Sequence, residues 1–141
     1  IVKWPKSVKA GTTSDVLFSQ VDLLASFAAV NNISYDSAQA IDTENHWEVL
    51  IGKEGQGRYG LVQEALFSNL AYLRNDGYKF IPGNTGPDMV PWGPIIETGF
   101  DKEDQLFNIK LDAKETKDLS TSEAEIMANM KKELEEIVKK N

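Results

Sequence analysis

Residues 69–84 read NLAYLRNDGYKFIPGN, and this stretch carries the clearest structural signal in the sequence. Two β-prone runs, 70–74 and 78–81, flank the turn sequence Asn75-Asp76-Gly77. An Asp-Gly pair between such runs is typical of a tight hairpin, because the turn needs a positive φ that glycine adopts without steric cost. The sequence therefore predicts a β-hairpin over 70–81.

More strands and a helix are predicted around this hairpin. Residues 61–67 and 105–110 are further extended runs. Ser120 and Glu123 have the spacing of a helix-starting capping box. Apolar residues behind that box recur at helical spacing: Ile126, Met127, Met130, Leu134, Ile137 and Val138. These elements predict an α+β fold, in which a small antiparallel β-sheet of about four strands is packed by a C-terminal amphipathic helix.

The N-terminal part is predicted to contain a strand and two helices. Residues 1–4 form an extended run that Pro5 stops. Ser19 to Asp22 has capping-box spacing ahead of a mostly apolar helix that ends at Asn31-Asn32. Asp42 or Thr43 is predicted to cap a short second helix, whose apolar side is formed by Trp47, Leu50 and Ile51 before Gly52 ends it. The glycine-rich segment 52–60 lacks the Gly-Lys-Ser/Thr of a phosphate loop and is interpreted as a flexible connection.

Composition limits the classes of partner. The 141 residues are 41% hydrophobic and 26% charged, as in an ordinary globular domain. The formal net charge of -7 argues against nucleic acid or an anionic membrane as the main partner. The longest apolar stretch, 21–30, is too short to span a bilayer. The absence of cysteine excludes disulfides, thiolate metal sites and a cysteine nucleophile.

Catalytic and metal-binding patterns are absent from the sequence. His46 is the only histidine, and without a partner at meaningful spacing it is interpreted as a surface or cap residue. No histidine pair or acidic set has the spacing of a metal site. We therefore assign no catalytic residue and no metal ligand to this chain.

One loop is a candidate for binding. Residues 82–99 hold four of the five prolines and four glycines, a length and composition typical of a functional or a disordered loop. Within it, Trp92 could stack on a sugar ring, with Asn84 and Asp88 as polar neighbours. The same indole could instead pack the loop onto the sheet. Both interpretations of Trp92 stay open at this point.

Four segments together resemble a known family. They are IVKWPKSVKAGTTSDVLFSQVDLLASFAAV at 1–30, NHWEVLIGK at 45–53, LAYLRNDGYKFI at 70–81 and DQLFNIKLDAKETKDLS at 104–120. In this order they resemble the C-terminal part of sulfatases, the formylglycine-dependent, arylsulfatase-type enzymes of the alkaline-phosphatase superfamily. The exception is 82–104, where the connection is longer than the family pattern.

The resemblance implies a division of the chain and a role for it. Residues 1–52 would be the tail of the N-terminal α/β catalytic domain, left as a strand-helix remnant, and 53–141 would be the C-terminal subdomain that closes one side of the cleft. The parent would hydrolyse sulfate esters of a small molecule or glycan, using formylglycine and calcium in its N-terminal domain. The Cys/Ser-x-Pro-x-Arg motif that supplies formylglycine is absent here, so no catalytic position carries over. The family also implies a bacterial protein that is periplasmic or secreted.

Two other classes are weighed against this hypothesis. A free-standing glycan-binding or interaction module would use Trp92, although a natural module is not expected to begin inside a strand. A fragment of a related phosphonate or phosphodiester hydrolase is the other alternative. On the sulfatase hypothesis the chain alone is predicted to be inactive on a generic aryl sulfate. Apolar residues in 1–35 are then predicted to self-associate or to fold back onto the small sheet.

Overall fold

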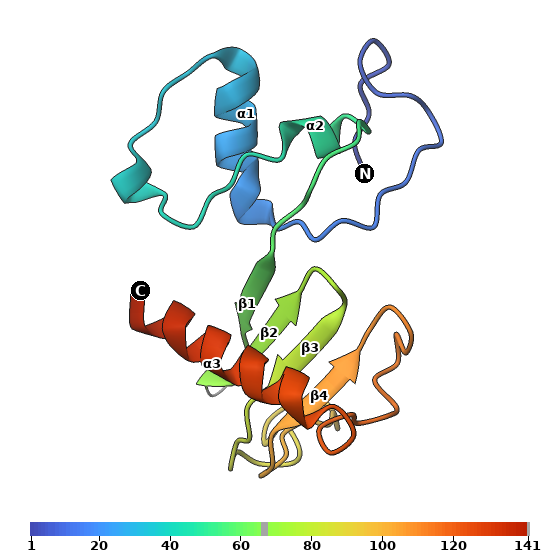
Figure 1. Cartoon of the computed structure of the whole chain (residues 1–141), viewed down its shortest axis with the longest axis vertical. Helices are drawn as coiled ribbons and strands as arrows, with labels where there is room; N and C mark the ends of the chain where they lie inside the picture. The colour runs from blue at the N-terminus through green and yellow to red at the C-terminus, as the bar shows by residue number, and fades with distance from the viewer. Residues whose placement is uncertain (66–67, 141) are drawn as a thin grey trace. The chain divides into compact units, whose positions relative to one another are not determined.

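The computed structural model describes residues 1–65 and 68–140 of the chain. It consists of two compact units, Ile1–Tyr59 and Gly60–Asn141 (Figure 1). Each unit has its own secondary structure and its own buried groups, and the two are described in turn.

The second unit contains a four-stranded antiparallel sheet. Its strands follow the chain in the order β1-β2-β3-β4 and are Gly60–Glu64, Leu70–Arg74, Tyr78–Ile81 and Gln105–Asn108. The predicted sheet is thereby confirmed. The predicted run 61–67 includes residues 66 and 67, which lie outside the described residues. The last strand is shorter than the predicted 105–110, because the Asn108 carbonyl accepts the Leu111 and Asp112 N–H groups and turns the chain.

The predicted hairpin turn is present between β2 and β3. Gly77 has φ +97°, and its N–H donates to the Arg74 carbonyl at 2.9 Å. A Cβ at Gly77 would lie 2.7 Å from Lys110 Cγ. Glycine is therefore favoured here for two reasons: it adopts the positive φ easily, and it leaves room for the Lys110 side chain. Asp76 Oδ1 accepts the Tyr78 N–H and holds the turn against β3.

The core of this unit lies between the sheet and helix α3, Ala124–Lys140, which crosses one face of the sheet (Figure 1). The register pairs Tyr72 with Phe80 and Phe80 with Leu106, which places these three side chains in one row on the same face. The buried core residues come from both layers: Tyr72, Phe80, Leu106, Met130 and Leu134. The apolar stripe predicted for the final helix therefore contains the residues that close the core.

Two details of the final helix differ from the prediction. Val138 is half-exposed and lies outside the core stripe. The predicted start directly behind a Ser120 capping box is wrong, since α3 begins at Ala124. Ser120 belongs to the turn before the helix, where its hydroxyl donates to Asp118 Oδ2 at 3.0 Å and its N–H donates to Asp118 Oδ1 at 2.8 Å.

The first unit is helical. Its elements are the 3-10 turn η1 Gln20–Asp22, helix α1 Leu23–Asn31, the 3-10 turn η2 Ser37–Gln39 and helix α2 Trp47–Leu50. The predicted helix start is confirmed, with the Ser19 N–H donating to Asp22 Oδ2 at 3.0 Å. The predicted end is confirmed as well, because Asn32 adopts a left-handed conformation with φ +53°.

The strand predicted at residues 1–4 is wrong. The described part of this unit contains no strand with which these residues could pair, and the Trp4 carbonyl instead accepts the Ser7 and Val8 N–H groups in a turn. The Trp4 ring lies against Trp47, with ring centroids 5.5 Å apart. Among the described residues, no helix has the length and apolar character to cross a membrane.

The cap predicted for the short helix is also wrong. Thr43 Oγ1 accepts the Ala25 N–H at 3.1 Å and donates to the Val21 carbonyl at 2.7 Å, so it supports the start of α1. Helix α2 begins later, where Asn45 Oδ1 accepts the Trp47 N–H. It ends as predicted at Gly52, which has φ +77°.

Candidate functional site

The long connection between β3 and β4, residues 82–104, is an ordered arm. Its two ends are joined by the Gly83 N–H, which donates to Asp104 Oδ1 at 2.9 Å, and by the Asn84 N–H, which donates to the Asp101 carbonyl at 2.6 Å. A Cβ at Gly86 would collide with the Phe100 ring, so a residue without a side chain is needed there. We call residues 82–104 the arm.

Farther out, the arm forms a short two-stranded ladder. Met89 and Glu97 are bridge partners, and the Val90 N–H donates to the Ile96 carbonyl at 3.0 Å. The Thr98 N–H donates to the Asp88 carbonyl at 2.9 Å, and the Thr98 hydroxyl donates to the Pro87 carbonyl at 2.7 Å. These bonds fix the arm on both sides of its tip, residues 89–96. The paired backbone therefore fixes the position of the tip at the end of the arm.

The three residues predicted to bind substrate lie at three levels of this arm. Asn84 is half-buried at the base, where its Oδ1 accepts the Gly86 N–H at 2.7 Å. Asp88 is exposed and contributes its carbonyl to the ladder. Trp92 lies in the tip and is 57% exposed. The arm thus carries all three, but it uses Asn84 for its own turn, and contact of any of them with substrate remains a prediction.

The tip exposes more apolar surface than Trp92 alone. Ile95 is 92% exposed, and Met89 and Ile96 are exposed with it. The sequence shows the signal as MVPWGPII, eight uncharged residues between Asp88 and Glu97. The reasoning from sequence singled out only the indole and missed its aliphatic neighbours.

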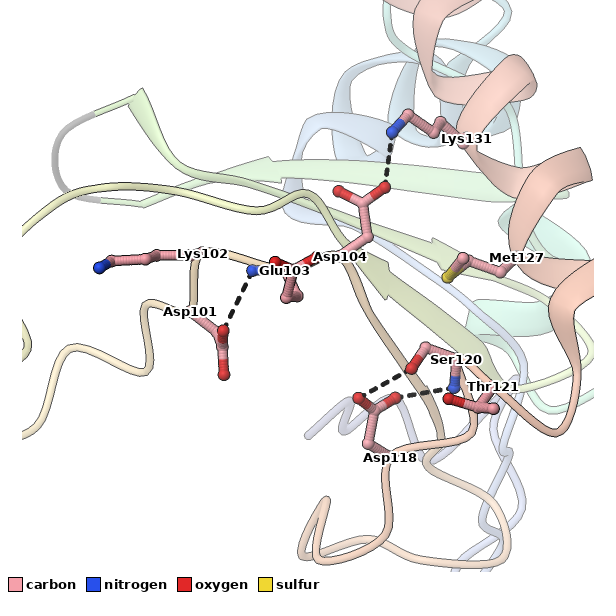
Figure 2. Close-up of a pocket in the computed structure, with 9 residues that line it drawn as sticks. All are labelled: Asp101, Lys102, Glu103, Asp104, Asp118, Ser120, Thr121, Met127 and Lys131. Atoms are coloured by element: carbon pink, nitrogen blue, oxygen red, sulfur yellow. Dashed lines mark hydrogen bonds and ion pairs between the residues drawn. The ribbon is translucent and has the colours of Figure 1, made fainter.

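A groove of 670 Å³ lies beside the base of the arm. Three segments meet there: the end of the arm, the turn before α3, and the first turns of α3 (Figure 2). The lining residues are Asp101, Lys102, Glu103, Asp104, Asp118, Ser120, Thr121, Met127 and Lys131. Figure 2 shows Lys131 reaching from α3 to Asp104, with Nζ and Oδ2 2.6 Å apart, while Lys102 extends away from this pair.

The charged groups of the groove are stabilised by their neighbours. Partial burial alone would raise the pKa of Asp104. The Lys131 ammonium and the Gly83 N–H together outweigh this effect, so the pKa of Asp104 lies below the ordinary 3.8. The hydrogen bond to Asp104 in turn raises the pKa of Lys131 above its ordinary 10.5. For Asp118 burial again opposes ionisation, yet the N–H groups of Ser120 and Leu106 bring its pKa below 3.8. These carboxylates are therefore charged and already occupied at neutral pH.

The groove and the predicted binding residues do not coincide. Trp92, Asp88 and Asn84 are absent from its lining. Three of its acidic side chains accept hydrogen bonds from the chain itself: Asp101 from the Glu103 N–H, Asp104 from Lys131 and Asp118 from Ser120. The groove lies at the base of the arm, and the exposed apolar side chains of the arm lie at its tip. Within residues 1–65 and 68–140, no group of three or more histidine, aspartate or glutamate side chains could hold a metal ion.

The first unit contains a buried ionic network that the sequence reasoning missed. Asp22 is fully buried, and its Oδ1 accepts from Arg58 Nη1 at 2.8 Å. Arg58 is also buried and donates twice to the Asp42 carbonyl, at 3.1 and 2.7 Å. Its Nε is buried without a hydrogen-bond partner among the described residues. The end of segment 52–60, which the sequence predicts to be a flexible connection, is packed in this unit: the Arg58 N–H donates to the Leu17 carbonyl at 2.8 Å, and a Cβ at Gly57 would collide with that carbonyl.

His46 belongs to the same network and is not a surface residue. It is 8% exposed, and its backbone N–H donates to the buried Ser26 hydroxyl at 3.0 Å. Its ring nitrogens lie 3.1 Å from the Gln56 carbonyl and 3.1 Å from Glu44 Oε2. It directly precedes α2, so its position as a cap residue is confirmed although its side chain does not cap. The network ties both helices to the segment before β1 and has the character of a structural element.

Comparison with known proteins gives one curated relative and several solved structures. The chain is 30% identical over 137 residues to an N-acetylgalactosamine-6-O-sulfatase of Bacteroides thetaiotaomicron. This match covers 97% of the chain and 26% of the relative, so the chain spans about a quarter of that protein's length. No protein-family model matches the chain.

The solved structures agree with that relative. A Bacteroides thetaiotaomicron structure from a study of the metabolism of multiple glycosaminoglycans matches with a TM-score of 0.88 and 30% identity, over 97% of this chain and 28% of that one. The crystal structure of Ps i-CgsB matches with a TM-score of 0.68 and 26% identity, over 94% of this chain and 27% of that one. The complex of Ps i-CgsB with k-i-k-neocarrahexaose matches with a TM-score of 0.67. The resemblance predicted from the sequence is confirmed, and it extends over almost the whole chain.

Proposed function

We infer that this chain, which is the C-terminal part of a sulfatase, comes from an enzyme that hydrolyses sulfate esters of glycans. The reaction consumes water and gives the free sugar hydroxyl and inorganic sulfate. The observation that carries this proposal is the match in sequence and fold to an N-acetylgalactosamine-6-O-sulfatase over nearly all of the chain. A 6-sulfated N-acetylgalactosamine is therefore the first substrate to test.

The residues of this chain do not supply the chemistry of ester cleavage. The sequence has no Cys/Ser-x-Pro-x-Arg motif, and the described residues offer no metal-ligand group, so formylglycine and calcium do not fit here. We propose that both belong to the catalytic domain of the parent. Formylglycine, made from a residue of that domain, would supply the nucleophile, and calcium bound there would balance the charge of the sulfate.

The role left to this chain is to pack beside that domain and to shape the substrate cleft. Its second unit has a complete core of its own and therefore offers a rigid base for the arm. We propose that the arm reaches substrate through Trp92, with Asp88 and Asn84 as polar neighbours. A stacked indole contributes on the order of 1 kcal/mol, which changes affinity several-fold.

The proposed activity is tested by comparing the chain with its full-length parent. On p-nitrophenyl sulfate with calcium, residues 1–141 alone should show no turnover above buffer, while the parent should release sulfate from 6-sulfated N-acetylgalactosamine. Turnover by the purified chain would overturn the division of roles. A parent that cleaves a phosphonate or phosphodiester but no sulfate ester would overturn the activity.

The role of the arm is tested by Trp92→Ala in the parent. We expect KM for the sulfated glycan to rise several-fold, with kcat and the hydrolysis of p-nitrophenyl sulfate little changed. Leu111→Ala is the control, since Leu111 is an exposed apolar residue outside the arm. Equal losses on both substrates would assign Trp92 a folding role, and no loss on either would remove the arm from the site.

We also propose that the parent is a periplasmic or secreted bacterial protein, in keeping with the family resemblance and a bacterial relative. Cell fractionation with antibody detection tests this location. Recovery of the parent in the cytoplasmic fraction would overturn it.

A further inference from the structure

The tip of the arm is uncharged, and its frame is acidic. No charged residue occurs in 89–96, while Asp88 and Glu97 stand directly on either side. The ladder fixes this arrangement, because Glu97 is the bridge partner of Met89 and the Asp88 carbonyl accepts the Thr98 N–H. The tip that carries Trp92 and Ile95 therefore projects from a paired base at which two acidic residues, Asp88 and Glu97, lie on the two strands.

The rest of the arm strengthens this electrostatic pattern. Its ionisable residues are Asp88, Glu97, Asp101, Lys102, Glu103 and Asp104. Five acids and one lysine give a formal charge of -4 over residues 82–104. Lys131 of α3 pairs with Asp104 at the base of the arm, as Figure 2 shows, and Asp104 lies outside the tip. An approaching sulfate group thus meets negative charge without a compensating lysine or arginine in the tip.

Such a surface is unsuited to a sulfate group and suited to the apolar face of a sugar. Two like charges about 10 Å apart weaken binding roughly two-fold in water and about twenty-fold at an effective dielectric constant near 20. An indole beside aliphatic side chains, in contrast, stacks on a pyranose ring without needing charge on it. The tip would therefore bind a sugar ring without a sulfate more tightly than a sugar ring that carries one.

We propose that the tip of the arm receives an unsulfated sugar ring next to the ring whose sulfate is hydrolysed, and that Asp88 and Glu97 exclude a second sulfate from this position. This inference rests on the proposed function and narrows its substrate to glycans that are singly sulfated around the point of attack. A chain sulfated on both neighbouring rings would first have to lose the adjacent sulfate to another sulfatase. The arm is then a specificity determinant that acts by electrostatic exclusion.

The test uses the full-length parent and two matched disaccharides. Both contain 6-sulfated N-acetylgalactosamine joined to a hexose, and only one carries a further sulfate on that hexose. We expect wild type to prefer the singly sulfated disaccharide about ten-fold in kcat/KM at low salt, and the preference to shrink at high salt. Asp88→Asn combined with Glu97→Gln should reduce this preference to about two-fold, because KM should improve more for the doubly sulfated substrate than for the singly sulfated one.

Controls separate this outcome from general effects of charge and folding. Both substitutions are isosteric, and the ladder uses backbone groups of these residues, so the arm should keep its shape. Glu125→Gln with Glu136→Gln removes the same charge from exposed positions of α3 and should leave the preference unchanged. Trp92→Ala should raise KM for the singly sulfated disaccharide and not for the sulfated monosaccharide.

Several results would overturn the inference. One is a wild-type preference for the doubly sulfated disaccharide, or a preference that the arm variant leaves unchanged. Another is a change of oligomeric state in Trp92→Ala, measured by light scattering, because the tip would then bind protein and not sugar. Failure to desulfate either disaccharide, together with failure on the monosaccharide, would instead reject the proposed function itself.

Discussion

The two units of this chain are stabilised in different ways. In Gly60–Asn141, large apolar side chains from a sheet and a helix enclose one another, and the core includes Tyr72, Phe80 and Met130 with no exposed surface. In Ile1–Tyr59, the buried apolar residues are small or few, and the fully buried side chains include Asp22 and Ser26. Large apolar residues such as Leu24 and Phe27 are about half exposed there, at 50% and 51%.

The difference shows which unit can hold its structure from its own contacts. Apolar burial is the main favourable contribution to folding, and the second unit achieves it internally. A buried ion pair such as that of Asp22 and Arg58 fixes geometry but adds little net stability, because removing both charges from water offsets their attraction. We therefore expect the first unit to depend on further covering for its stability and the second unit to be self-sufficient.

The largest effect is expected from the core of the second unit. Phe80→Ala should lower its free energy of unfolding by about 4 kcal/mol, since it removes a buried ring and leaves a cavity. Hydrogen exchange of β2 and β3 amides in the full-length protein measures the loss. Leu111→Ala removes an exposed side chain and is the control, with an expected change below about 0.5 kcal/mol. Similar protection in both variants would show that the core is not what holds this unit.

The next largest effect is expected in the ionic network of the first unit. Arg58→Met leaves the Asp22 carboxylate buried without its cation, which should cost about 3 kcal/mol. Faster hydrogen exchange in α1, with β2 and β3 unchanged, would show that the loss stays within the first unit. Lys53→Met breaks an exposed pair with Glu48 and should have almost no effect. Equal effects of the two variants would contradict a special role for the buried pair.

The same contrast explains how much of the fold could be predicted from the sequence. In the second unit, short-range signals agree with long-range packing: Asp76-Gly77 marks the turn and Met130 and Leu134 mark the buried side of α3. In the first unit the signals were local and their partners distant. Thr43 was expected to cap the helix that follows it, but it bonds to Ala25 and Val21, earlier in the chain. Spacing rules do not reveal such contacts.

The sequence predicted where the candidate site lies in the chain, but it did not predict the contacts and exposure of the side chains there. The length and proline content of residues 82–99 predicted a functional or a disordered loop, and the structure shows a hydrogen-bonded arm there. Asn84 was expected to face substrate, but its side chain completes its own turn with Gly86. The exposed apolar tip and the two acidic residues at its base, Asp88 and Glu97, became apparent only from the exposure of the side chains and from the ladder. For Arg58 the sequence offers no periodic signal, because its partners Asp22 and Asp42 lie 36 and 16 residues earlier in the chain.

A smaller effect is expected on association of the isolated chain. Residues 1–141 alone are predicted to self-associate through the exposed apolar side of α1, which includes Leu24 and Phe27. Replacing both by lysine should raise the dissociation constant at least ten-fold, or about 1.4 kcal/mol. Light scattering across a concentration series measures this, with Lys9→Ala as the control. A monomer at all concentrations, with fast exchange over 21–30, would contradict the prediction and show that this unit tolerates its exposed surface.

The smallest effect is expected at the pair of Asp104 and Lys131, which joins the base of the arm to α3. Lys131→Met should lower the stability of the second unit by about 0.5 kcal/mol at neutral pH, as for other partly exposed pairs. The pKa of Asp104 lies below 3.8, so the stability it contributes is present above that value and is lost as the pH falls through the lower, folded-state pKa. The pKa of Lys131 lies above 10.5, so its contribution is present below that value and is lost as the pH rises past the folded-state pKa.

Wild type and Lys131→Met should therefore differ between these limits and converge in acid and in strong base. Urea unfolding at a series of pH values measures the difference. Lys132→Met is the control, because Lys132 is the next residue of the same helix and is exposed. A difference that persists unchanged in acid would mean that Lys131 acts by packing its aliphatic chain against the groove. In that case apolar contacts would stabilise the base of the arm, as they stabilise the core of this unit. Charge would then have a role only in the proposed selection of substrate at the tip.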